Sequence, residues 1–256
     1  MATIKDKLHF NFDGIWSEVH GVINVNLDSG MLDEVFVADR DIVETRVKGN
    51  RKSRLHSVES SPIEFDMTIA FENGFTDSSI DSVVRWLFTD TYKPLYFIGN
   101  ENKVFYCMPT NASSIVHNGL SKGYFTITMR CNSSSVYSPV IVTTPTTVAT
   151  SSIVTIVNDG HYDVYPEISI KKTSIGNVVI ESLDDSGSIF EVRNLTNQED
   201  IYINCEKEII ETDLIGVYRY EDVIGEFPRI LKGKSNRFKI TGSCIIQFRL
   251  SNEYKF

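Results

Sequence analysis

The chain has 256 residues, of which 41% are hydrophobic and 23% are charged, a composition that is ordinary for a folded protein and excludes global disorder. Its length predicts two domains, each long enough to bury a core of its own. The net charge of −9 disfavours general binding to DNA or RNA, because such binding usually relies on a basic surplus.

The first predicted strand covers Val19–Val25, where apolar and polar residues alternate. His20 falls on the polar side of this alternation, so we expect a solvated imidazole there. The next segment, residues 39–60, is rich in charge and contains the turn sequence Gly49-Asn50. It is longer than a normal connection, and long structured loops are usually functional. It is therefore predicted to form a protruding arm or extended hairpin.

A basic cluster lies within this arm, in a short window free of acidic residues. Its five members are Arg46, Lys48, Arg51, Lys52 and Arg54. Against the acidic background of the chain, the cluster is a strong local asymmetry of charge. It is compatible with a subunit-interface arm that meets an acidic surface on a neighbouring subunit, with a solvated hairpin tip, and with contact to passing nucleic acid. Complementary charge mainly sets register and partner choice.

Two further strands and a helix follow. Long alternations predict strands over residues 63–72 and 124–131, each with one buried face. Between them, a helix is expected over about 78–89, with Thr76 or Asp77 as its N-cap. Its apolar residues recur at helical spacing, and Trp86 is expected in the core or at an interface. The sequences PLYFIGN and KVFYCMP then predict a strand pair around Gly99-Asn100.

A boundary is predicted in the Pro- and Thr-rich stretch SPVIVTTPTTVATS. This divides the chain into an N-terminal domain of residues 1–138, an extended linker of residues 139–151 and a C-terminal domain of residues 152–256. The second half then shows close-spaced strand patterns separated by turn residues and no helical pattern. Such spacing is typical of an antiparallel sandwich.

No catalytic or cofactor-binding motif is present. The five histidines are isolated, and the acidic pair Asp184-Asp185 is expected to lie solvated in a turn. We therefore expect no enzyme, no cofactor and no metal. The first residues contain no apolar signal segment, and no apolar run is long enough to span a membrane. We expect neither a secretion signal nor a membrane partner.

The cysteines are far apart and form no CxxC pair, which argues against a zinc site or a disulfide framework. Cys131 and Cys205 each continue an apolar alternation, as buried free thiols do. This usage is consistent with assembly in a reducing cytoplasm. Four free cysteines are expected: Cys107, Cys131, Cys205 and Cys244.

The order of these segments resembles a known family. The pieces that carry the resemblance are LHFNFDG, the charged arm, PIEFDMTIAFENG, the helix with RWLF, NDGHYDVYPEI at 158–168 and EFPRILKGKSNRFKITGSCIIQFRL at 226–250. Together they are similar to the distal tail protein of siphoviruses that infect Gram-positive bacteria. The most specific are the turn that leads to Tyr165-Pro166 and the late pattern of Pro228, Gly233, Asn236 and Gly242.

The resemblance implies a fold and a set of partners. The expected fold is mainly β, with an N-terminal β-sandwich-like domain with one helix and a protruding arm, and a C-terminal galectin-like antiparallel β-sandwich. Family members form hexameric rings, single or stacked, at the distal end of the tail of the virion. The implied partners are further copies of the chain, the major tail tube protein, the end of the tape-measure protein, the tail-associated hub protein and a receptor-binding protein. The implied role is to join the tail tube to the tail tip or baseplate and to dock components of host adsorption.

The galectin-like expectation also raises the alternative of a carbohydrate-binding or host-adhesion module. Galectin sites use a tryptophan and a histidine-asparagine-arginine set to bind sugar. The second half of this chain has no tryptophan, and His161 falls in a turn rather than in an HxNxR strand. The sequence therefore favours a docking module for the C-terminal domain, and the alternative is expected to show a concave aromatic surface.

Overall fold

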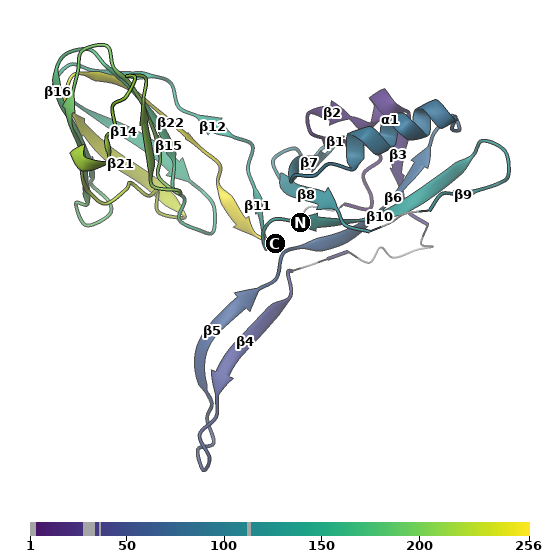
Figure 1. Ribbon diagram of the computed structural model, residues 1–256. Helices are drawn as coiled ribbons and strands as arrows, with labels where there is room; N and C mark the ends of the chain where they lie inside the picture. Colours follow the sequence, from purple (N-terminus) through teal and green to yellow (C-terminus); the bar gives the residue numbers. More distant parts are fainter. Residues whose placement is uncertain (1–3, 28–33, 36, 112–113) are drawn as a thin grey trace. The chain divides into compact units, whose positions relative to one another are not determined.

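A computed structural model describes residues 4–27, 34–35, 37–111 and 114–256 of the chain. The chain divides into two compact units (Figure 1). Unit 1 comprises Met1–Tyr137 and Lys255–Phe256, and unit 2 comprises Ser138–Tyr254. Both are built from antiparallel strands, with one α-helix among the described residues, so the expected mainly β fold is confirmed.

Unit 1 is built on an eight-stranded sheet in the order β2-β1-β7-β8-β10-β6-β3, with β9 paired to β10. Its strands are β1 (Phe10–Phe12), β2 (Ile15–Trp16), β3 (Val22–Val25), β6 (Glu64–Phe71), β7 (Lys93–Phe97), β8 (Phe105–Pro109), β9 (Val116–His117) and β10 (Gly123–Cys131). The central pair β6 and β10 buries alternate residues, as a strand with one core-facing side does. Strand β11 (Ser135–Tyr137) follows at the end of the unit.

Helix α1 (Asp77–Leu87) packs on this sheet and starts one residue earlier than expected. Thr76 accepts a hydrogen bond from the Ser79 N–H, and the Ser79 hydroxyl accepts one from the Thr76 N–H, which forms a capping box. Trp86 is a core residue, as expected. Its indole N–H donates to the Phe12 carbonyl at 2.9 Å, and its ring stacks on Phe10 at 5.6 Å.

The prediction for Val19–Val25 is wrong in its first half. Residues Ser17–His20 form a 3₁₀ turn, η1, which ends at Gly21 in the left-handed region with φ of 61°, and the strand starts at Val22. The expectation of a solvated His20 is also wrong. The imidazole stacks on Trp86 at 4.3 Å, and its Nδ1 lies 3.0 Å from the Ser82 hydroxyl. The turn rotates the side chain onto α1, where burial lowers the pKa of His20.

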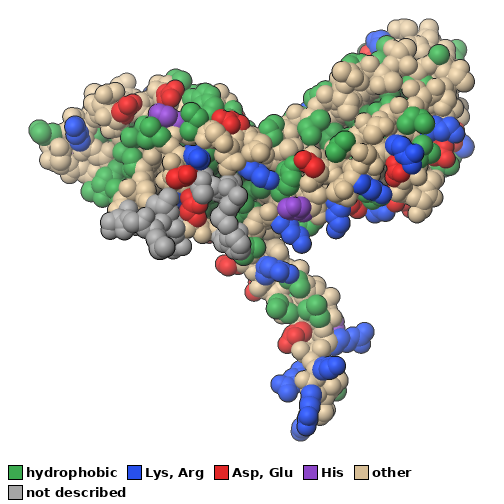
Figure 2. Space-filling view, turned by 180° about the vertical axis from the view of Figure 1, so that it is seen from behind, with side chains coloured by type: hydrophobic (Ala, Val, Ile, Leu, Met, Phe, Trp, Pro, Cys, Tyr) green, Lys and Arg blue, Asp and Glu red, His purple; other side chains and the backbone are tan. Residues whose placement is uncertain are grey.

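Unit 1 also carries a separate hairpin of two strands, β4 (Arg40–Thr45) and β5 (Arg54–Ser60). Every residue of both strands is exposed, and the two strands pair with each other and with no further described strand. Figure 1 shows the hairpin standing clear of the eight-stranded sheet, and Figure 2 shows Lys and Arg side chains gathered toward its end. This is the protruding arm that the sequence predicts.

Unit 2 is a sandwich of two antiparallel sheets. The six-stranded sheet has the order β12-β22-β15-β18-β19 with β13 on β22, and the five-stranded sheet has the order β14-β21-β16-β17-β20. Their strands are β12 (Ile141–Val142), β13 (Thr146–Val148), β14 (Ser151–Asn158), β15 (Glu167–Lys172), β16 (Gly176–Ser182), β17 (Ile189–Leu195), β18 (Asp200–Asn204), β19 (Ile209–Thr212), β20 (Val223–Gly225), β21 (Lys234–Thr241) and β22 (Cys244–Leu250). A second 3₁₀ turn, η2 (Tyr220–Asp222), precedes β20, and β23 (Glu253–Lys255) is the last strand.

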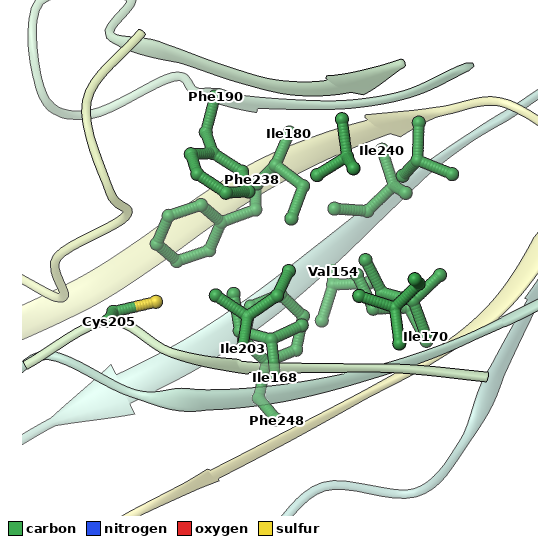
Figure 3. Packing of buried hydrophobic residues seen from close by; sticks show 14 of the residues in the cluster. Val154, Ile168, Ile170, Ile180, Phe190, Ile203, Cys205, Phe238, Ile240 and Phe248 are labelled. Atoms are coloured by element: carbon green, nitrogen blue, oxygen red, sulfur yellow. The ribbon is translucent and has the colours of Figure 1, made fainter. Parts of the chain in front are cut away.

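The core of unit 2 lies between the two sheets. Side chains from both sheets meet there, and Phe238 of one sheet stacks on Phe248 of the other at 5.7 Å (Figure 3). Burial of this aliphatic and aromatic cluster is the main source of stability for such a sandwich. Cys205 and Cys244 belong to the same cluster.

The expected linker at residues 139–151 is not an extended connection. Ile141 and Val142 pair with Leu250 and Arg249, and residues 146–148 pair with the start of β22. Two short strands of unit 2, of two and three residues, therefore lie within the segment. Pro139 and Pro145 lie outside these strands, as expected for residues that cannot donate to a ladder.

Candidate assembly surface on the basic hairpin

The hairpin presents apolar side chains to solvent, most of them on one face, with Val43 on the other. Residues that oppose each other across an antiparallel pair point to the same side. Ile42 opposes Val58, and Glu44 opposes Leu55, so these apolar side chains share a face. Ile42 is 65% exposed, Leu55 59% and Val58 38%. We call these three residues the apolar stripe. Apolar side chains gathered on one exposed face mark an interaction surface.

A β-bulge interrupts the strand pairing in the part of the hairpin nearer its tip. The register shifts between Val43 and Glu44, which leaves His56 as the extra residue of β5. Its Nε2 lies 2.8 Å from the Thr45 hydroxyl, across the two strands. The bulge therefore ties the strands together next to the turn, and it increases the local twist.

The end of the hairpin holds the five predicted basic residues. Arg46, Lys48, Arg51 and Lys52 lie in the connection between the strands, and Arg54 is the first residue of β5. All five are exposed, and none makes an ion pair with the residues that the structure describes. Gly49 takes a φ of 92° in the turn, and the Asn50 side chain accepts the Lys52 N–H at 3.2 Å. We call these five side chains the basic tip.

Acidic residues lie toward the base of the same hairpin. Asp41 and Glu59 oppose each other near the base, and Glu44 lies nearer the tip on β4. Arg40 lies beside Asp41 at the base, so the base carries both signs of charge, whereas the tip is basic alone. Such an arrangement provides no acid–base chemistry. It provides orientation, since an acidic partner surface pairs with the tip and not with the base.

The acidic pair expected to be solvated in a turn is instead held by arginines. Asp184 accepts two hydrogen bonds from the Arg237 guanidinium, at 2.9 and 3.1 Å, and Asp185 accepts two from Arg229, at 2.7 and 3.0 Å. The Arg237 contacts lower the pKa of Asp184 to about 2, and Arg229 lowers the pKa of Asp185. Both carboxyls therefore stay ionised at neutral pH and do not form the acid–base pair of a hydrolase.

Sequence reasoning missed a buried charged network in unit 2. The Arg219 guanidinium contacts both carboxylate oxygens of Glu199 at 2.8 Å and one oxygen of Asp222 at 2.9 Å. The side chains of Arg219 and Glu199 are 7% and 0% exposed. Arg219 and Glu199 lie 20 residues apart in separate turns, and no spacing rule links them. The Arg219 guanidinium and the Glu199 carboxylate hydrogen-bond to each other and to groups of neighbouring turns. The network therefore has a structural role.

Other kinds of site find no support in the described parts of the chain. No three His, Cys, Asp or Glu residues converge there as metal ligands, and no helix there is long and apolar enough to span a membrane. The four cysteines are free and buried, as expected. Burial raises the pKa of Cys205 to about 12 and also raises that of Cys244, which makes these thiols poor nucleophiles.

The turn residues singled out in the sequence of unit 2 have structural roles. Asn158 is fully buried, donates to the carbonyls of Tyr162 and Ile230, and accepts from the Gly160 N–H. Asn236 accepts from the Leu231 N–H and donates back to the Leu231 carbonyl. These side chains replace missing backbone partners in turns. They define a fold and not a ligand site.

These observations define a class: a β-rich structural protein of two units, with an exposed arm suited to contact with another subunit. Models of two protein families match the chain. One is described as a phage tail protein N-terminal domain and matches residues 5–133, and the other is described as a phage tail C-terminal domain and matches residues 136–250. The chain therefore belongs to this family of phage tail proteins and is a component of the virion tail.

Individual relatives and solved structures are similar to the chain along most of its length. The SPbeta prophage-derived uncharacterized protein YomH of Bacillus subtilis is 30% identical over 255 residues, which is 99% of each chain. Among solved structures, the Dit protein of phage SPP1 has a TM-score of 0.68 and 16% identity, over 95% of this chain and 98% of that one. That structure is described as a paradigm of the hub adsorption apparatus in phages that infect Gram-positive bacteria. A chain of the phage P2 baseplate has a TM-score of 0.48 and 9% identity, over 87% of this chain and 91% of that one.

Proposed function

We propose that the chain is the distal tail protein of a long-tailed phage, a non-enzymatic hub. Copies of unit 1 close into a ring, with six subunits as the resemblance implies. The ring joins the tail tube to the tail tip or baseplate. On this proposal, the major tail tube protein and the end of the tape-measure protein meet one face of the ring, and the tail-associated hub protein meets the other. Unit 2 serves as a docking module for components of host adsorption, such as a receptor-binding protein.

The observation that carries the proposal is the hairpin. It leaves the apolar stripe and the basic tip exposed, although apolar burial and charge pairing are what stabilise a strand pair. An isolated two-stranded hairpin is marginally stable in water, so a partner surface is the natural source of its stability. Family membership and the likeness of fold to SPP1 Dit support the same conclusion.

The decisive experiment compares the intact chain with a variant in which residues 46–54 are replaced by the turn Asn-Gly. Light scattering measures the mass in solution, and negative-stain microscopy shows whether a ring with a central hole forms. We expect a ring from the intact chain and a smaller species from the variant. Reversal of the exposed charges Arg193 and Lys207 of unit 2 is the matched control. A compact monomer from the intact chain at every concentration would contradict the proposal.

A second candidate, carbohydrate binding by unit 2, is favoured by one observation. The outer face of the six-stranded sheet has a hollow of about 530 Å³ next to Tyr202. The register places Gln247, Ser169, Tyr202 and Glu211 in one row across four strands. An aromatic ring beside amide and carboxylate groups suits a sugar. A glycan array measures this binding. Binding that is abolished in Tyr202→Ala, and kept in the control Tyr218→Ala at an exposed position, would support this function over docking alone.

A further inference from the structure

A groove beside α1 is left open in unit 1. It is a hollow of about 330 Å³ between the helix and the sheet, and its lining is entirely apolar: Phe71, Ile80, Val83, Val84, Phe88, Ile115 and Phe125. Residues four apart on a helix lie one above the other, so Ile80 and Val84 form a row that leads to Phe88. Val84 is 46% exposed and Phe88 39%. The helix thus buries Val83 against the sheet and leaves the neighbouring apolar side chains Val84 and Phe88 partly exposed to solvent.

Acidic residues flank this groove. Asp77 and Asp81 lie one turn apart on α1, and both are exposed. Asp81 is three residues before Val84, which makes their side chains neighbours on the helix surface. Glu72 follows the lining residue Phe71 and is also exposed. The nearest cation on the helix is Arg85, whose Nε donates to the Asp81 carbonyl at 3.2 Å. The groove therefore combines an apolar floor with a mainly acidic rim.

The hairpin has the complementary features. The apolar stripe is exposed beside the basic tip, and Leu55 directly follows the tip residue Arg54. The hairpin leaves the sheet at the start of β6 and runs away from α1 of its own unit (Figure 1). Each copy thus carries one hairpin and one groove on different surfaces, which is what a head-to-tail contact between identical subunits requires.

We propose that the hairpin of one copy lies in the α1 groove of a second copy. The apolar stripe covers Val84 and Phe88, and the basic tip faces Asp77 and Asp81. The contact rests on the proposed function, since it is the heterologous contact that closes the ring. It names the receiving surface for the hairpin. Burial of apolar side chains on both partners supplies affinity, and the opposed charges fix the direction of docking.

Disulfide trapping tests the contact directly. The four native cysteines are buried, so an introduced surface cysteine is the reactive one. Leu55→Cys protein is mixed with Val84→Cys protein under mild oxidation, and linked dimers are separated on a denaturing gel. We expect a dimer that contains one copy of each variant. The matched control pairs Leu55→Cys with Leu120→Cys, which introduces a thiol at another exposed position of unit 1. Equal yields from the two mixtures would overturn the proposal.

A charge swap gives an independent test. Two double variants reverse the charges. One combines Asp77→Lys with Asp81→Lys, and the other combines Arg51→Glu with Lys52→Glu. Each is expected to weaken self-association by about tenfold or more, because charge reversal places like charges in contact. The two double variants mixed together restore association, since each supplies the charge that the other has lost. Sedimentation velocity measures the size, and circular dichroism checks that each variant is folded.

The outcomes separate this inference from the proposed function. The unmodified chain could assemble while the mixed double variants do not associate and no specific cross-link forms. The hairpin would then bind a different surface, and the groove would bind another occupant. The ring remains in that case. If the unmodified chain stays monomeric at every concentration, both the ring and the hairpin contact fall together.

Discussion

Arg219 and Glu199 form a bidentate ion pair inside unit 2, with Nε to Oε1 and Nη2 to Oε2 both at 2.8 Å. The Glu199 carboxylate also accepts from the Thr196 N–H and the Thr212 hydroxyl at 2.8 Å. Burial alone would raise the pKa of Glu199, but these donors outweigh it and hold the pKa below its ordinary range. The pair fixes the turn before β18 to the loop before η2.

Removal of the arginine leaves a buried carboxylate without its cation. We expect Arg219→Met to destabilise unit 2 by about 3–5 kcal/mol, the usual cost of breaking a buried ion pair from one side. Both tryptophans, Trp16 and Trp86, lie in unit 1, so tryptophan fluorescence reports on unit 1 alone. Urea unfolding followed by circular dichroism is therefore expected to show an early transition that fluorescence does not show.

The control for this variant is Arg193→Met. Arg193 pairs with Glu191 on the surface, with 46% of the arginine side chain exposed, and exposed pairs contribute little. We expect its urea midpoint to match that of the unmodified chain. If Arg219→Met also matched it, the buried network would have no role in stability.

The stability of unit 2 is predicted to fall in acid. The hydrogen bonds from Arg237 lower the pKa of Asp184 to about 2, from an ordinary value near 3.8. Because the folded state holds this carboxylate ionised, protons bind more readily to the unfolded chain. The stabilisation is therefore complete above the ordinary pKa and is lost as the pH falls from about 4 to about 2. Asp185 and Asp222 shift in the same direction and add to the effect.

Asp184→Asn tests this linkage. The variant is expected to be less stable than the parent at neutral pH and to lose less stability between pH 5 and pH 2.5. Thermal unfolding by circular dichroism at a series of pH values measures both. An unchanged slope against pH would show that the Arg237 contact does not persist in solution.

The central elements of the fold follow from local pattern. In β6 and β10 the alternation of apolar side chains matches the core-facing side, because one side of each strand packs under α1 and the other meets solvent. The helix is predicted by Thr76 as its N-cap and by apolar residues that recur at helical spacing. In unit 2, runs such as Ile168 to Ile170 and Phe238 to Ile240 mark buried sides of strands. The arm follows from excess length and charge.

The remainder depends on contacts that are distant in sequence. Strands β12 and β13 resemble a linker, because their short Thr-rich segments gain structure only from pairing with β22, about 100 residues later. The position of His20 depends on α1, which begins more than 50 residues after it. The partners of Asp184 and Arg219 are likewise far away in the chain. Of the candidate site, the basic tip is visible in sequence, but the α1 groove is not, since residues of a helix and two strands form it together.

The four cysteines are expected to be unreactive in the folded protein. All are buried, and Cys107 and Cys131 oppose each other on β8 and β10. Burial, together with the neighbouring Cys131 thiol, raises the pKa of Cys107. A thiol reagent at pH 8 should label almost none of the native protein and four cysteines per chain in denaturant. Rapid labelling of one or more thiols without denaturant would contradict this packing.

Gly242, in the turn between β21 and β22, provides the last prediction. Its φ is 119°, and a Cβ built there would overlap the Asn177 carbonyl oxygen. Gly216 has a φ of 75° with no atom within 4 Å of an added Cβ. Gly216→Ala should therefore cost only the left-handed conformation, about 1–2 kcal/mol. Gly242→Ala should cost about 3 kcal/mol or more, because the backbone of β16 must also move.

Circular dichroism in urea measures both glycine variants, with tryptophan fluorescence as the internal reference for unit 1. A larger loss for Gly242→Ala, confined to the transition that fluorescence does not report, would show that Gly242 is needed for the close approach of β21 and β22 to β16 in unit 2. Equal losses for the two variants would mean that the backbone near Asn177 moves without cost, and the close approach would then contribute nothing to stability.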